Sequence, residues 1–193
     1  MARRFPIALV LSLMCLAAPA WADYRAGEDA YFRGDYATAF RDLTPLAESG
    51  DAFSEYFLGL MYVKGEGVPQ DFKQAEYWFF LAAEQGHAQA QHNLGVMYAE
   101  GQGVPLDFKE AVRWYRLAAE QGEAKTQNNL GVMYTTDEGA LKDYVLAHMW
   151  FTLAAAQGEK DATVLRNSLR KKMTPAQIEV AQRLVREWKP RDK

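Results

Sequence analysis

The chain has 193 residues, of which 49% are hydrophobic and 24% charged, a composition typical of a globular protein and unlike collagen-like, disordered or polytopic membrane classes. Its formal net charge of −3 argues against binding to nucleic acid, which requires clustered cations. Its single cysteine excludes an intrachain disulfide and a multi-cysteine metal site.

The first 22 residues have the three-part pattern of a secretory signal peptide. Arg3 and Arg4 form a basic start, residues 5–16 are almost wholly apolar, and Ala20-Trp21-Ala22 places small residues at the two positions that a signal peptidase recognises. We therefore expect cleavage after Ala22 and a periplasmic or secreted protein. The alternative is a retained membrane anchor, but the apolar run is shorter than the roughly 20 residues that span a bilayer. No membrane span is expected in the mature chain.

Cys15 lies in this apolar region, and Met14 before it is not the small residue that a lipoprotein signal requires. The mature chain from Asp23 would contain no cysteine, so it can enter an oxidising compartment without disulfide chemistry. Its charge is uneven: residues 23–165 contain 11 basic and 22 acidic residues, whereas 166–193 contain 9 basic and 3 acidic. An acidic body therefore precedes a basic tail.

Residues 51–158 form three units of 36 residues that align without a gap. The columns that are identical in all three units begin with Leu58, Gly59, Met61, Tyr62, Ala75, Trp78, Ala82 and Gly86. A partial unit precedes them, in which Asp35, Ala39, Ala47 and Gly50 fall in the same register. Its first half matches poorly, which is typical of the end cap of a repeat array.

Each unit has the pattern of two helices. Ala75, Trp78 and Ala82 share one helical face, Asp71 is placed to cap the helix start, and Gly86 to end it. The two glycines and the proline of residues 65–69 favour a turn between the helices. One helix pair cannot bury its apolar face alone, so adjacent units are expected to stack.

These columns resemble the Sel1-like repeat, a relative of the tetratricopeptide repeat, over Asp35 to Gly158, and the Ala-Glu-Gln-Gly turn at residues 83–86 fits it too. The resemblance implies an all-α fold, a right-handed α/α superhelical solenoid of about four helix-pair repeats, used for protein–protein contact and with no shared chemistry. The expected divisions are a signal peptide (1–22), a partial N-terminal capping repeat (23–50), three repeats (51–86, 87–122 and 123–158), and basic C-terminal capping helices (159–193).

The last repeat departs from this pattern. Asp137-Glu138-Gly139-Ala140-Leu141 replaces the Gly-x-Gly-Val-Pro turn, and Val145 replaces the lysine of the two earlier units. The change is either neutral drift near the end of the array or an acidic contact loop.

The tail is expected to continue as helix and to cover the last repeat. Thr174 can cap a helix, Pro175 suits its first turn, and Gln177 completes a capping box. Basic residues lie on the outer side of the tail: Arg166, Arg170, Lys171, Lys172, Arg183 and Arg186. They form either a solvated face or a surface for an acidic partner or anionic lipid.

The resemblance also implies where a partner would bind, because the first helix of each pair lines the concave face in tetratricopeptide-like solenoids. Carried over by register, this strip comprises Phe53, Tyr56, Leu60, Val63, Gln89, His92, Asn93, Val96, Lys125, Asn128, Asn129 and Val132. Aromatic anchors beside amides suit an extended peptide or a helix in a groove. The alternative is that the apolar members pack internally between helices.

No catalytic, cofactor or metal site is expected. His87 and His92 are five residues apart, a poor spacing for one helical face, and His148 adjoins Met149 and Trp150 on a packed helix. Neither a Gly-x-Ser-x-Gly motif nor a phosphate loop is present. We therefore expect a non-enzymatic exported adaptor or regulator that binds an envelope protein or peptide. The alternatives are a structural component of cell-wall or exopolysaccharide machinery that binds glycan and, less favoured, an enzyme acting on cell-wall or β-lactam substrates.

Overall fold

The computed structural model describes residues 20–136 and 142–191, which contain ten α-helices and no strand. The helices are α1 (Ala20–Phe32), α2 (Tyr36–Glu48), α3 (Ala52–Lys64), α4 (Phe72–Glu84), α5 (Ala88–Glu100), α6 (Phe108–Glu120), α7 (Ala124–Met133), α8 (Tyr144–Ala156), α9 (Lys160–Arg170) and α10 (Pro175–Glu187). The expected all-α solenoid is confirmed.

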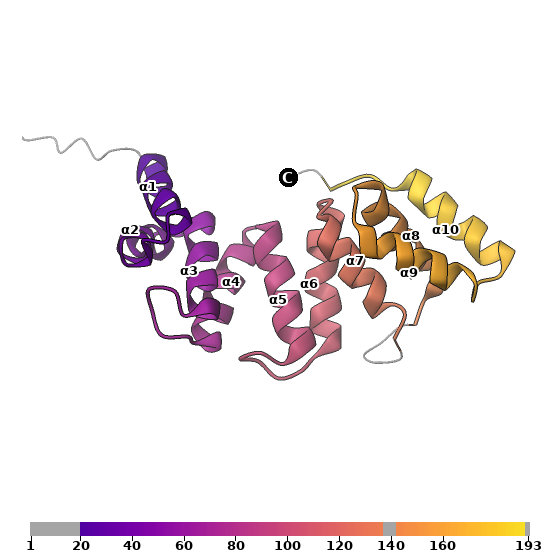
Figure 1. Ribbon diagram of the computed structural model, residues 1–193, viewed down its shortest axis with the longest axis horizontal. Helices are drawn as coiled ribbons and strands as arrows, with labels where there is room; N and C mark the ends of the chain where they lie inside the picture. Colours follow the sequence, from indigo (N-terminus) through magenta and orange to yellow (C-terminus); the bar gives the residue numbers. More distant parts are fainter. Residues whose placement is uncertain (1–19, 137–141, 192–193) are drawn as a thin grey trace, which may run out of the picture.

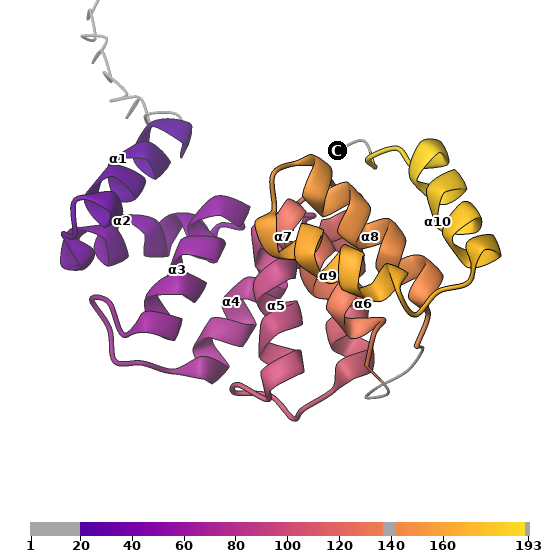
Figure 2. The same cartoon turned by 45° about the vertical axis from the view of Figure 1, so that its right-hand side comes forward.

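Each helix packs on the next along the chain up to α9, and α10 packs back on α8 (Figures 1 and 2). The N-terminal unit, whose first half matches the repeat poorly, is a helix pair of α1 and α2. Helix α1 begins at Ala20, so the predicted cleavage point after Ala22 lies in its first turn. The rest of the expected signal peptide, with Cys15, and the variant segment 137–141 lie outside the described residues.

The predicted helix caps are present. Asp71 accepts hydrogen bonds from the backbone N–H groups of Lys73 and Gln74 at 2.9 and 3.1 Å, and Asp107 and Asp143 do the same at α6 and α8. These bonds satisfy donors that the first turn of a helix leaves without partners. The capping box at the start of α10 is also formed.

A column of glycines sets the distance between the two helices of each repeat. Gly59 in α3 lies against the ring of Phe79 in α4, Gly95 against Tyr115, and Gly131 against Phe151. A Cβ atom added at Gly95 would lie 2.4 Å from the Cδ1 atom of Tyr115, closer than carbon atoms pack. The rings are buried, so each repeat is held by an aromatic ring lying flush on a glycine.

Buried glutamines tie each helix pair to the previous pair. Gln91 in α5 donates through Nε2 to the carbonyl oxygen of Ala83 in α4 at 3.0 Å. Its Oε1 accepts from Nε2 of Gln121, just after α6, at 2.9 Å. A glutamine suits this position because one side chain both donates to one neighbour and accepts from another.

The arrangement recurs one repeat later. Gln127 in α7 donates to the carbonyl of Ala119 at 3.1 Å and accepts from Gln157 at 2.9 Å. Gln91 and Gln127 are both buried, so their amide groups need these partners. We call the set formed by Gln91, Gln127 and their partners the glutamine ladder.

Glu55 occupies the same position in the first complete repeat. Its Oε2 accepts from Nε2 of Gln85 at 2.7 Å, as Gln91 accepts from Gln121, and the residue is only 2% exposed. An ionised carboxylate has no proton to donate to the preceding helix. Burial raises the pKa of Glu55, and the nearby negative charge of Asp51 raises it further, while the Gln85 bond opposes the rise.

Replacing Gly95 with alanine should destabilise the fold, because its Cβ would overlap the buried ring of Tyr115. We expect a net loss of about 1–2 kcal/mol of unfolding free energy, even though alanine is the better helix former by about 1 kcal/mol. Urea unfolding measures the loss. In a Tyr115→Leu background the same change should cost less, and an unchanged cost there would contradict the assigned contact.

Replacing Glu55 with glutamine should stabilise the protein at neutral pH. Because the folded state raises the pKa of Glu55, the contribution of this residue to the free energy of unfolding is fully present below the unfolded pKa. It is lost as pH rises through the folded pKa. The Glu55→Gln variant should gain about 1 kcal/mol at pH 7, the worth of one hydrogen bond, with the gain shrinking as pH falls through the raised pKa toward about 4.5, the ordinary value of glutamate. Thermal unfolding across this range tests it, and a gain independent of pH would contradict the argument.

Candidate functional site

The predicted partner-binding strip lies on the first helices of the three repeats, α3, α5 and α7, but its members differ in accessibility. Phe53, Gln89 and Lys125 occupy one column, in the first turn of each helix, and all three are exposed. Tyr56, Asn93, Asn128 and Asn129 are half-buried. The accessible part of the strip is therefore concentrated at the N-terminal ends of these helices.

The aliphatic members of the strip pack against the core. Leu60, Val63, Val96 and Val132 are partly buried against the hydrophobic clusters formed by neighbouring helices. They therefore offer less surface to a ligand than their place in the register suggests. The asparagines differ among themselves: Asn129 hydrogen-bonds to Tyr115, whereas the buried Oδ1 of Asn128 has no hydrogen-bond partner in the part of the chain that the structure describes.

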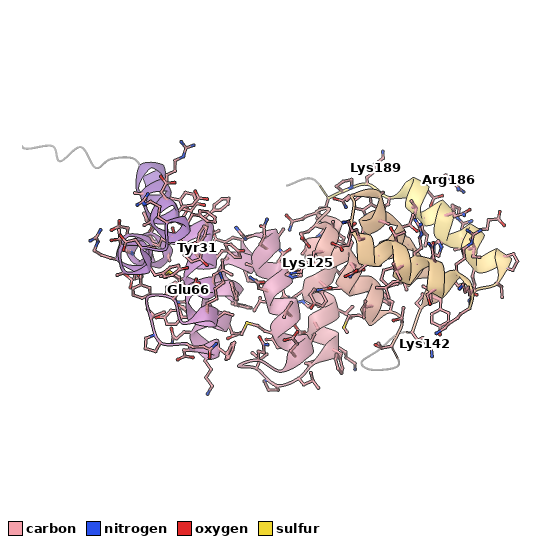
Figure 3. All side chains as sticks on the ribbon, in the orientation of Figure 1. Tyr31, Glu66, Lys125, Lys142, Arg186 and Lys189 are labelled. Carbon is pink, nitrogen blue, oxygen red and sulfur yellow. The ribbon has the colours of Figure 1, made fainter. Side chains whose placement is uncertain are left out.

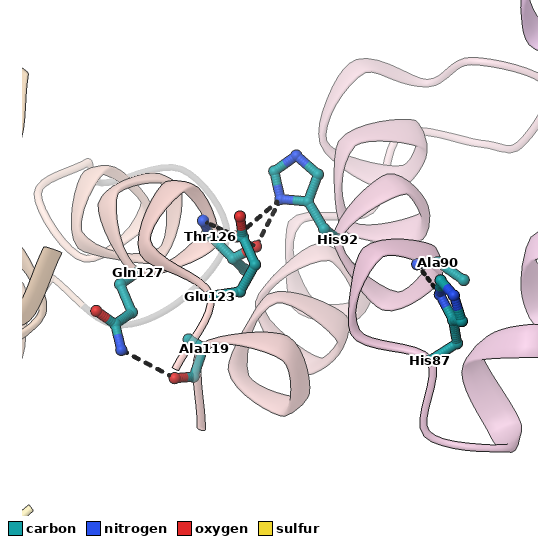
Figure 4. A network of polar contacts seen from close by, with 7 residues as sticks. All are labelled: His87, Ala90, His92, Ala119, Glu123, Thr126 and Gln127. Atoms are coloured by element: carbon teal, nitrogen blue, oxygen red, sulfur yellow. Dashed lines mark hydrogen bonds and ion pairs between the residues drawn. The ribbon is translucent and has the colours of Figure 1, made fainter. Parts of the chain in front are cut away.

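His92 is buried, with 8% of its surface exposed, and it joins α5 to α7 rather than facing solvent (Figure 4). Its Nδ1 lies 2.6 Å from Oγ1 of Thr126 and 3.8 Å from Oε2 of Glu123. The Thr126 hydroxyl in turn donates to Glu123, which also caps α7. Because this hydroxyl has one proton and gives it to the carboxylate, Nδ1–H of His92 donates to Thr126.

Burial lowers the pKa of His92, and the nearby Lys125 lowers it further, although the carboxylate of Glu123 opposes both. The ring is therefore neutral at pH 7 and acts as a junction between repeats.

Aromatic groups gather at the start of the array. The ring of Phe53 meets His87 edge-on at 5.0 Å, and the ring of Tyr56 stacks on His87 at 4.6 Å. His87 caps α5, since its Nδ1 accepts from the backbone N–H of Ala90 at 3.3 Å. Phe53 remains 53% exposed and forms an aromatic surface that a ligand can reach.

A cavity of about 640 Å³ runs along this edge of the array, where the second helices end and the first helices begin. We call it the edge groove, and it is lined by Ala52, Phe53, Gln85, Gly86, His87, Ala88, Gln89, Gln91, Leu117, Gln121, Gly122, Glu123 and Arg191. It contains the exposed Phe53 and Gln89 of the predicted strip together with glutamines of the ladder. It is open to solvent, and its lining combines amide side chains with the exposed ring of Phe53, which suits an extended ligand.

Sequence reasoning missed most of this groove. Gln85 and Gln121 belong to the recurring Ala-Glu-Gln-Gly turn, which the sequence indicates only as a feature of the family, and His87 directly follows the first of these turns. Each of these segments leads into the exposed first turn of the next helix. Their repetition in the sequence could therefore have indicated a surface along this edge of the array. No sequence pattern around Arg191 predicts that this residue lies at the groove.

Among the basic residues predicted on the tail, Arg166 on α9 is half-buried and the others are exposed. Lys171 and Lys172 lie in the turn between α9 and α10. Figure 3 shows Arg186 and Lys189 at the α10 end of the molecule, away from Lys125 on the array. Within residues 20–136 and 142–191, no group of histidine, cysteine and acidic residues is arranged to hold a metal ion. None of the helices in these ranges is long and apolar enough to cross a membrane.

Comparisons with known proteins agree with this architecture. The Sel1 repeat family matches residues 52–87, 88–123 and 124–159. A protective antigen of uropathogenic Escherichia coli strains, which displays an SLR fold, is 46% identical over 72% of this chain, with a TM-score of 0.69. A Sel1 repeat protein from Oxalobacter formigenes is 34% identical over 74% of the chain, with a TM-score of 0.71.

The matched regions cover 31% of the first of these proteins and 59% of the second, so the chain spans less than two thirds of either. No curated protein matches the chain. Sel1 repeat proteins are generally non-enzymatic scaffolds, and the family indicates a protein–protein interaction module.

The His92 junction should weaken in acid. Because the folded state lowers the pKa of His92, its contribution to stability is present above the unfolded pKa of about 6.5 and is lost as pH falls from there through the lowered folded pKa. Replacing His92 with asparagine should cost about 1 kcal/mol at pH 7.5, the worth of the lost hydrogen bond, and less at pH 5.5. Urea unfolding at both values measures the difference. Burial also lowers the pKa of His148, but His148 is present in both proteins, so its effect on stability cancels in the comparison. A cost of the His92 substitution that is equal at both pH values would contradict the assigned hydrogen bond.

Proposed function

The chain belongs to the Sel1 repeat family, and we propose that it is an exported adaptor of the bacterial cell envelope that binds an extended segment of a partner protein in the edge groove. The observation that carries this proposal is the groove itself. It joins an exposed aromatic ring to a row of amide side chains along two consecutive repeats.

The chemistry of the groove favours a polypeptide. Gln89 can both donate and accept hydrogen bonds, as the peptide backbone does. The Nε2 of Gln85 already donates to Glu55, and that of Gln121 to Gln91 and Gly86, so these two side chains can accept from an extended chain through Oε1. Phe53 offers a partly exposed ring of the kind that anchors interfaces. Its contact with His87 limits the motion of the ring, which reduces the entropy lost on binding.

Export is supported by the sequence alone. The first 22 residues have the basic, apolar and small-residue parts of a signal peptide, and no cysteine follows Ala22. The two similar solved structures are bacterial proteins, which favours the periplasm over other exported locations.

A photoreactive phenylalanine analogue in place of Phe53 tests the proposal in living cells. We expect it to crosslink one dominant protein, and the chain recovered from the envelope fraction should begin at Asp23. The matched control places the analogue at Val164, which is 68% exposed on α9 and far from the groove, and it should give no such adduct. Replacing Gln85 and Gln89 with alanine should reduce the yield at Phe53 about fivefold, since each hydrogen bond contributes about 0.5–1.5 kcal/mol.

Each other outcome counts against a stated part of the proposal. Equal adducts from Phe53 and Val164 would reject the groove as the binding surface. Glycan captured at Phe53 without any protein would favour the glycan-binding alternative, because an exposed aromatic ring also suits a sugar. A chain that stays in the cytoplasm with residues 1–22 attached would reject export.

A further inference from the structure

The segment that follows α10 returns to the middle of the array. Helix α10 packs on α8, yet the chain beyond it runs back toward the end of α6 (Figure 1). There the backbone N–H of Arg191 donates to the carbonyl oxygen of Glu120 at 2.7 Å, and its guanidinium Nη1 lies 3.4 Å from the carboxylate of Glu120. Arg191 also lines one end of the edge groove.

This contact uses two properties of a helix C-terminus. The last carbonyl groups of a helix have no donor within the helix, so Glu120 can accept a bond from an outside N–H. The helix dipole also places partial negative charge at this end, which favours a cation beside it. The side chain of Glu120 adds a full negative charge at the same point.

The preceding repeat presents the same arrangement without an occupant. Glu84 ends α4 as Glu120 ends α6, one repeat of 36 residues earlier, and its side chain is exposed. Within the part of the chain that the structure describes, no donor contacts its carbonyl oxygen and no cation its carboxylate. The edge groove lies along the turns that follow these two helix ends.

We propose that the edge groove binds an extended basic segment of the partner, with arginine or lysine side chains at the ends of α4 and α6, and that the chain's own residues 189–191 occupy the α6 end when the partner is absent. This inference rests on the adaptor function proposed above. It is argued from the Arg191 contact, which shows one basic residue bound in an extended stretch, and from the acidic character of the body.

The affinity should depend on several contacts together. The Arg191 side chain is 63% exposed, and one such ion pair contributes little by itself. A segment that reaches from Glu120 to Glu84 would form two of these contacts and could also pair its backbone with the glutamines between them. The tail contacts only one helix end, so such a partner would displace it.

A fluorescent nona-arginine peptide, compared with nona-glutamate at low ionic strength, provides the probe, with anisotropy as the measurement on the purified chain. Wild-type protein should bind the arginine peptide and not the glutamate peptide. The double variant Glu84→Gln, Glu120→Gln should bind nona-arginine about fivefold more weakly, as expected for two cations at helix ends. The double variant Glu100→Gln, Glu110→Gln removes the same charge at the opposite edge of the array and should change the affinity by less than about twofold.

Displacement of the tail is tested separately. Arg191→Pro removes both the N–H donor and the guanidinium, and it should tighten binding about threefold, because the tail then no longer competes for the end of α6. Lys171→Gln removes one positive charge from an exposed site elsewhere on the tail and should tighten binding less. Circular dichroism of each variant confirms that the helices are retained.

Two results would overturn the inference: equal losses for the two glutamate double variants, or equal gains for Arg191→Pro and Lys171→Gln. Neither would affect capture of a protein at Phe53, which tests the adaptor function. Conversely, basic-peptide binding with no protein captured at Phe53 would reject the adaptor while retaining the groove chemistry.

Discussion

The contact between a glycine and an aromatic ring in each repeat is the constraint on which the rest of the structure depends. Gly59, Gly95 and Gly131 let the second helix approach until a ring lies flush on the first helix. This distance recurs at an interval of 36 residues, so every repeat has the same shape and the next can stack on it in the same way. The edge of the array is then a regular row of turns, and a groove can form along that row.

The glutamine ladder connects this packing to the binding surface. Gln91 and Gln127 fix each helix pair on the one before it, while their partners Gln121 and Gln157 come from the turns at the array edge. Since Gln121 also lines the groove, the surface offered to a ligand is held in place by buried hydrogen bonds. Glu55 is the exception to the ladder, since its carboxylate accepts from Gln85 but has no proton to donate to the preceding helix pair.

The fold could be predicted because its signals are local or periodic. Asp71 caps a helix through its own next residues, and the column of Gly59 repeats at a fixed interval. The site depends on contacts between segments that are distant in sequence, so only part of it could be predicted. His92 was expected on the binding face but is turned into the junction with Thr126, and the place of Arg191 depends on how α10 packs, which no local pattern shows.

The three repeats differ in the exposed first turn of their first helices. The first-turn column holds Phe53, Gln89 and Lys125, an aromatic ring, an amide and a cation, whereas the column of Gly59 does not vary. Only glycine fits at this packing contact, because a larger residue would separate the two helices. The exposed column has no such restriction, and its members Phe53 and Gln89 place different groups in the groove from two consecutive repeats. A segment binding in the groove would therefore meet chemically different contacts on helices whose packing is the same in each repeat.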